Sequence, residues 1–69
     1  MKRETKAGGW VKKLMNPVMH ITKGALWVKW EMDRNRYEIY RNGVRVEFGR
    51  TPHYPLEKFL EYAEMAWAN

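Results

Sequence analysis

Apolar and polar residues alternate between residues 18 and 48, which is the two-residue period of β-strands. Turn-forming residues interrupt this alternation at Lys23-Gly24, at 33–36 and at Asn42-Gly43. Asn-Gly is the strongest of the three signals, because both residues readily adopt the positive φ angles of a type I′ turn. The pattern therefore predicts a four-stranded antiparallel meander with strands at about 18–22, 25–32, 36–41 and 44–48.

Helical spacing replaces the alternation after residue 55. An apolar stripe runs along this segment through Leu56, Phe59, Leu60, Ala63 and Trp67. Pro55 suits the first turn of a helix, where its missing N–H is not needed. We therefore expect a helix over about 55–67 that covers one face of the sheet, which gives an α+β fold with an N-terminal extension.

The N-terminal extension divides into two parts. Residues 1–8 are polar and rich in lysine, which is typical of a flexible basic tail, and residues 9–69 are expected to form one small domain. Residues 9–15 fit either one or two helical turns ending before Pro17 or a short strand. The sequence also leaves open whether 9–17 covers the second face of the sheet.

The three turns also predict which residues lie opposite one another. Two-residue loops place Ile39 opposite Val46 and Ile21 opposite Leu26, and a four-residue loop at 33–36 places Trp30 opposite Ile39. Each of these registers puts apolar side chains on the same face of the sheet. That agreement supports the meander.

The same registers predict rows of side chains across the second face. His20 and Trp27 form one row, and the next contains Val18, Lys29, Tyr40 and Arg45. Exposed aromatic residues of this kind stack on nucleobases or anchor protein interfaces. The alternative is that residues 9–17 fold over Trp27 and Tyr40 and bury them.

A third predicted row contains only carboxylates, namely Glu31, Glu38 and Glu47. Like charges directly opposite one another destabilise a sheet, so this row needs a physical reason. One reason is diagonal pairing, of Glu38 with Lys29 and Arg45 and of Glu47 with Arg36. The other is a surface that accepts basic groups of a partner.

The net charge of +5 is unevenly distributed. Residues 1–50 contain 12 of the 13 Lys and Arg residues and five of the eight acids, so attraction to an anionic partner is expected there. Arg34, Arg36 and Arg50 are predicted to gather at one end of the meander, where guanidinium groups bind phosphate or carboxylate. Lys12 and Lys13, in the basic arm, complete the predicted anion-binding residues.

Several kinds of chemistry find no support in the sequence. Cys and Ser, the commonest covalent nucleophiles, are absent, and His20 and His53 lack further ligands for a metal site. We therefore expect no enzymatic activity and no cofactor. No apolar run approaches the roughly 20 residues of a membrane span, and the lack of Cys and the N-terminal Met favour a cytoplasmic protein without a membrane partner.

The sequence thus predicts a small binding protein that acts stoichiometrically on a macromolecule. In size and surface character it resembles small phage or mobile-element proteins that inhibit a host protein, here one that handles nucleic acid. The carboxylate row favours this protein partner. The alternative is a basic nucleic-acid-binding module that uses the N-terminal arm and the aromatic residues. A homodimer through an edge strand or through Trp67 is a further hypothesis.

Overall fold

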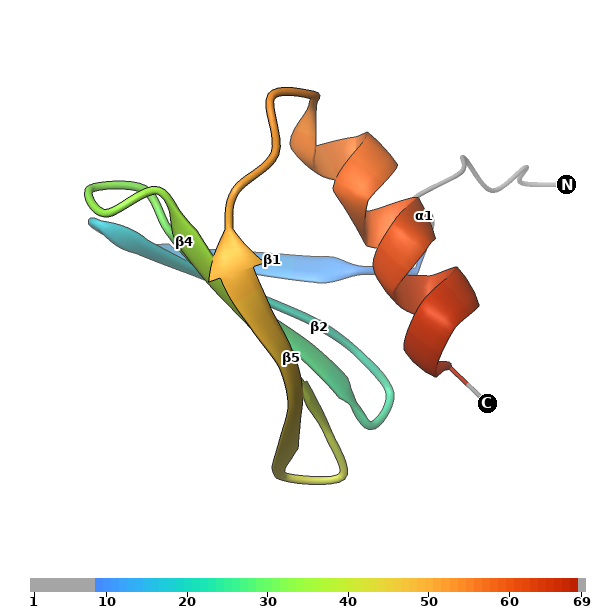
Figure 1. Ribbon diagram of the computed structural model, residues 1–69. Helices are drawn as coiled ribbons and strands as arrows, with labels where there is room; N and C mark the ends of the chain where they lie inside the picture. Colours follow the sequence, from blue (N-terminus) through green and yellow to red (C-terminus); the bar gives the residue numbers. More distant parts are fainter. Residues whose placement is uncertain (1–8, 69) are drawn as a thin grey trace, which may run out of the picture.

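The computed structural model describes residues 9–68 and shows one antiparallel sheet covered on one face by one helix (Figure 1). The strands follow one another in the order β1-β2-β3-β4-β5. The α+β class is confirmed, but the sheet has five strands rather than four. The predicted flexible tail at 1–8 lies outside the described residues. The elements are β1 (Val11–Met15), β2 (Val18–Lys23), β3 (Leu26–Glu31), β4 (Arg36–Arg41), β5 (Val44–Arg50) and α1 (Leu56–Trp67).

The additional strand is β1, which resolves the choice left open for residues 9–15. It pairs with β2, with Leu14 opposite Met19, and lies at the edge of the sheet. A helix this short is marginal in water, whereas a strand obtains its backbone hydrogen bonds from β2. Trp10, just before the strand, packs against the core. Residues 9–17 therefore extend the sheet and do not cover its second face.

Two predicted registers are wrong by two residues. Ile21 lies opposite Val28 rather than Leu26, because the tight turn is Gly24-Ala25, with Gly24 at a φ of 62°. Trp30 lies opposite Tyr37 rather than Ile39, because the loop between β3 and β4 spans 32–35. A shift of two residues leaves every side chain on its predicted face, so alternation alone did not reveal the error.

The predicted register between β4 and β5 is also wrong, and this error changes the face on which the later residues of β5 lie. Ile39 lies opposite Glu47 rather than Val46, while Tyr40 still lies opposite Arg45. Val46 is thus the extra residue of a β-bulge, and beyond it each side chain points to the face opposite to the one predicted. Glu47 moves to the helix side of the sheet and Phe48 moves to the other side.

The core lies between the helix and β2, β3 and β4. Its buried residues come from the predicted apolar face of the sheet and from the predicted stripe of α1, and they are Ile21, Leu26, Val28, Ile39, Phe59, Leu60 and Ala63. The Phe59 ring lies 5.0 Å from the Trp30 ring and 4.6 Å from the Tyr37 ring, centroid to centroid. These aromatic contacts fix the helix across the sheet.

Glu47 accepts three hydrogen bonds at the boundary of this core. The donors are the hydroxyls of Tyr37 (2.7 Å) and Tyr62 (2.6 Å) and the indole N–H of Trp67 (2.8 Å). Burial alone would raise the pKa of Glu47, but the three donors lower it below its ordinary value. The bond to Glu47 in turn raises the pKa of Tyr62 to about 12. Glu47 therefore connects β4, β5 and the last turns of α1.

Replacing Glu47 with Gln should lower the free energy of unfolding by roughly 1–3 kcal/mol, because an amide cannot accept all three donors. Because the pKa of Glu47 is lower in the folded protein than its ordinary 4.5, the stabilisation is present above pH 4.5 and is lost as the pH falls through the folded pKa. Urea unfolding at neutral and at acidic pH measures both effects.

Glu61→Gln is the control, since the same chemical change on α1 removes no side-chain hydrogen bond recorded within residues 9–68. We expect its effect to stay within about 0.5 kcal/mol. Equal effects of the two variants at neutral pH would show that the three donors do not hold the carboxylate.

Candidate functional site

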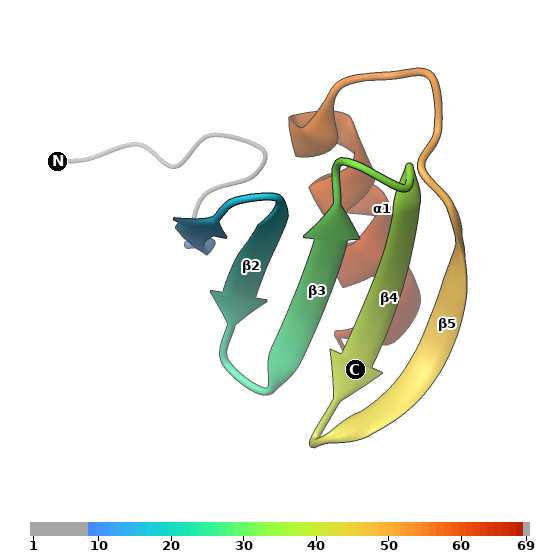
Figure 2. The same cartoon turned by 90° about the vertical axis from the view of Figure 1, so that its left-hand side faces the viewer.

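The sheet face that points away from α1 is the candidate site, and we call it the outer face. Figure 2 looks onto it, with β2 to β5 in front and α1 behind. Its side chains are those that alternate with the core residues along the strands. The observed registers arrange them in rows that differ from the predicted ones.

The first row is aromatic and basic. It contains Thr22, Trp27, Tyr40 and Arg45, so the structure brings together three of the predicted partner-binding residues. Trp27 is 52% exposed, and its ring meets that of Tyr40 edge to face at 6.4 Å between centroids. Because residues 11–15 pair with β2 as a strand of the sheet, the alternative that residues 9–17 fold over this pair is excluded.

The second row contains His20, Lys29, Glu38 and Phe48. Phe48 is the aromatic residue that sequence reasoning missed. A regular strand would place Phe48 on the helix side, because Val44, Val46 and Phe48 alternate without a break, and nothing in that pattern indicates a bulge. The guanidinium of Arg45 lies 4.4 Å above the centroid of the Phe48 ring, which extends the aromatic surface towards β5.

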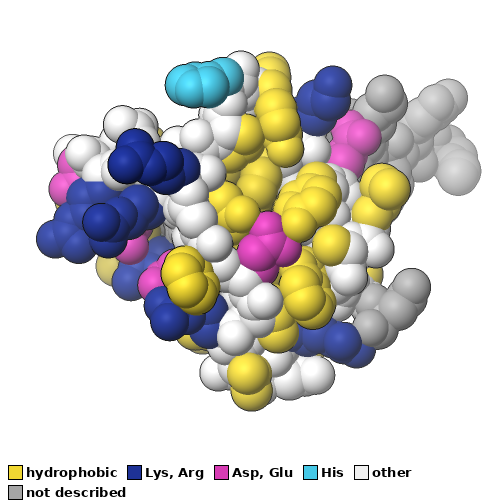
Figure 3. Space-filling view, in the orientation of Figure 1, with side chains coloured by type: hydrophobic (Ala, Val, Ile, Leu, Met, Phe, Trp, Pro, Cys, Tyr) yellow, Lys and Arg dark blue, Asp and Glu magenta, His cyan; other side chains and the backbone are white. Residues whose placement is uncertain are grey.

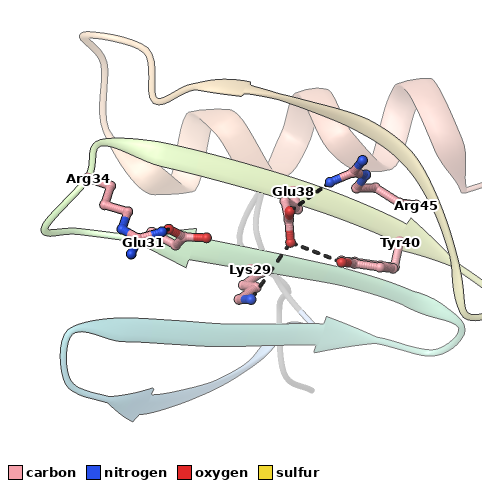
Figure 4. A network of polar contacts seen from close by, with 6 residues as sticks. All are labelled: Lys29, Glu31, Arg34, Glu38, Tyr40 and Arg45. Atoms are coloured by element: carbon pink, nitrogen blue, oxygen red, sulfur yellow. Dashed lines mark hydrogen bonds and ion pairs between the residues drawn. The ribbon is translucent and has the colours of Figure 1, made fainter.

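Glu38 organises the centre of the outer face (Figure 4). It accepts hydrogen bonds of 2.9 Å from Arg45 Nη1 and from the Tyr40 hydroxyl, and its carboxylate lies 3.8 Å from Lys29 Nζ. Burial alone would raise the pKa of Glu38, but the bonds from Tyr40 and Arg45 lower it. Its negative charge is therefore matched by the two cations that the diagonal-pairing interpretation named, but Lys29 lies directly opposite Glu38 and only Arg45 is diagonal to it.

The predicted row of three carboxylates is wrong. Glu38 lies opposite Lys29, and Glu31 lies opposite Arg36 with its carboxylate 3.8 Å from Arg34. Glu47 is on the helix side, so neither its predicted pairing with Arg36 nor a role on the outer face is found. Two errors combine here, namely the two-residue shift between β3 and β4 and the bulge in β5.

The third row is rich in arginine. Arg36 lies directly opposite Arg50, and Arg34 in the adjoining loop completes the cluster expected from the sequence. Together with Lys29 and Arg45 they line a groove of about 610 Å³. Within residues 9–68, neither Arg36 nor Arg50 forms an ion pair. Arg36 thus lies between Glu31 on β3 and Arg50 on β5, and Arg50 faces a like charge across the strands.

The positive charge of the described residues is concentrated on this side of the molecule. Figure 3 shows Lys and Arg side chains gathered on the side of the sheet opposite the helix. Two carboxylates, Glu31 and Glu38, accompany six cations on or beside the outer face, and these cations are Lys13, Lys29, Arg34, Arg36, Arg45 and Arg50. Asp33, in the same loop as Arg34, adds a third negative charge, so the outer face and this loop have an excess of three positive charges.

The two lysines of β1, Lys12 and Lys13, lie on opposite faces of the sheet. Lys13 lies opposite His20 on the outer face, whereas Lys12 is on the helix side and forms a 2.8 Å ion pair with Glu57. The prediction that they belong to one anion-binding set thus fits Lys13 better than Lys12. Trp67 bonds Glu47 within its own chain, which accounts for this tryptophan without a second copy.

Two further features bear on the chemistry of the site. Within the described part of the chain, no three His, Cys, Asp or Glu side chains come together in a way that would hold a metal ion. Among residues 9–68 there is also no helix with the length and apolar character needed to cross a bilayer.

Comparison with known proteins adds no relative. No family model matches the chain, and no match was found among curated proteins or solved structures.

Iodide quenching should test whether the outer face is open to solvent. Trp27 is half exposed beside Lys29, which attracts the anion, whereas the Trp30 ring packs on Phe59. We expect Trp27→Phe to remove most of the emission that iodide quenches. The control Trp30→Phe should leave that fraction in place. If Trp27→Phe left iodide quenching unchanged, something would have to cover this face in solution.

Proposed function

We propose that the protein binds nucleic acid through its outer face, without catalysing a reaction. The observation that carries this proposal is the arginine row. Arg36 and Arg50 face each other in a groove lined by five cations and two carboxylates, next to exposed aromatic side chains on the same surface. Phosphates would lie in the groove and bases against Trp27 and Tyr40.

The unpaired arginines support an anionic partner. Like charges opposite one another weaken a sheet, and an anion between them would turn that repulsion into attraction. A guanidinium group matches the geometry of phosphate and keeps its charge at any physiological pH. A phosphate between Arg36 and Arg50 would therefore be more favourable than the direct juxtaposition of the two guanidinium groups.

The corrected registers also reverse the ranking of partners. The carboxylate row was the reason to favour a protein with basic groups, and the structure does not contain it. Inhibition of a host protein, in the style of phage or mobile-element factors, stays as the second candidate. It is supported by the half-exposed Trp27 and the partly exposed Tyr40, because aromatic residues beside arginine are typical of protein interfaces.

A titration with random-sequence oligonucleotides at several salt concentrations tests the proposal. The logarithm of the binding constant should fall linearly with the logarithm of salt concentration, by about 0.7 for each phosphate contact with a single strand. Arg36→Ala combined with Arg50→Ala should therefore reduce this slope by about 1.4.

The matched control is Arg41→Ala with Lys58→Ala, which removes the same charge from the helix side of the sheet and from α1. We expect its slope to stay close to that of the parent. Failure of the parent to bind any oligonucleotide at low salt would exclude the proposal, and a host-protein partner would then take its place.

Replacing Glu31 and Glu38 with Gln distinguishes the two candidates. Nucleic acid should bind this double variant more tightly at low salt, because two repelling charges are gone, and the gain should shrink as salt rises. A protein that presents basic groups to these carboxylates should instead bind less tightly. Weaker binding of oligonucleotides to the double variant would contradict the expectation that these two carboxylates only repel nucleic acid.

A further inference from the structure

We infer that the nucleic acid recognised by the outer face is single-stranded, and that one unstacked base inserts into a hollow beside Trp27. This inference rests on the proposed function and specifies its substrate class. It is carried by the shape and lining of the hollow, which is separate from the arginine groove.

The hollow has a volume of about 260 Å³ and lies over β2 and β3. Its walls include the side chains of His20, Thr22, Trp27, Lys29 and Tyr40. Pockets for drug-sized molecules begin near 300 Å³. A space of this size suits one flat heterocycle and not a larger ligand.

The aromatic walls are held in a defined arrangement. The planes of Trp27 and Tyr40 are inclined by 62°, and the Tyr40 hydroxyl donates to Glu38, which fixes the second ring. Trp27 lines the hollow and is 52% exposed, so part of its side chain is free to contact a base. A base that stacks on an aromatic side chain typically gains about 1–3 kcal/mol.

Duplex nucleic acid does not offer what this hollow would bind. In a duplex the two faces of each base are covered by its neighbours, and taking a base out costs a few kcal/mol. Only phosphates and base edges remain accessible, and these would engage the arginines but not Trp27. A single strand presents its base faces without that penalty.

The hollow and the groove are placed so that one strand can use both. Lys29 lines both of them. Tyr40 and Arg36 are four residues apart on the same face of β4, which corresponds to roughly 13 Å. A strand that runs along β4 would thus contact the aromatic row at one end and the arginine row at the other.

Fluorescence anisotropy with labelled oligonucleotides tests the inference at physiological salt. The parent protein should bind a single strand at least about 5-fold more tightly than the duplex of the same sequence, because only the single strand gains the stacking. Trp27→Ala should weaken binding to the single strand by about 5- to 150-fold and should change duplex binding less than about 2-fold. Trp27→Phe, which keeps a ring, should retain most of the single-strand affinity.

Met65→Ala is the matched control, because Met65 is the most exposed large apolar side chain among residues 9–68 and lies on α1. It should leave both affinities unchanged. Equal affinity for the two substrates, or equal weakening of both by Trp27→Ala, would overturn the inference and leave the proposed function standing. Absence of binding to either substrate would overturn both.

Discussion

Glu47 carries its negative charge at the edge of the core, where Tyr37, Tyr62 and Trp67 donate hydrogen bonds to it. The carboxylate reaches these donors only because the β-bulge at Val46 reverses the faces on which the following residues of β5 lie. Burial of such a group without donors would be unfavourable, so the contacts and the bulge depend on each other. The position of α1 on the sheet and the composition of the outer face both follow from this arrangement.

Alternation and helical spacing were sufficient to predict β2 to β5, α1 and the face that each core residue occupies. They were not sufficient for the registers of the two hairpins, because a shift of two residues changes the opposite neighbour and not the face. Trp30 is an example, since it faces the helix whether it lies opposite Ile39 or Tyr37. The strand β1 was one of two alternatives, since its short apolar pattern fits both periods.

The bulge could not be predicted at all. Val44, Val46 and Phe48 continue the alternation of a regular strand, and the reason to depart from it lies in residues distant in sequence, such as Tyr62 and Trp67. The error extended to the candidate site, because a regular strand put Glu47 beside Glu38 and hid Phe48 in the core. The face of Trp27, Lys29, Tyr40 and Arg45 was predicted correctly, although their rows were not, since their face does not depend on the bulge.

Because Glu47 lies on the helix side, the outer face combines an aromatic row, a row centred on Glu38 and an arginine row. Glu38 balances Lys29 and Arg45, whereas Arg36 and Arg50 form no ion pair within the described residues.

The most direct test of nucleic-acid binding on this face is NMR mapping with a short single-stranded oligonucleotide. The account predicts shifts of the Trp27 indole N–H and of the amides of β3 to β5, with the Trp67 indole N–H unchanged. Shifts confined to α1, with the Trp27 signal unaffected, would contradict it.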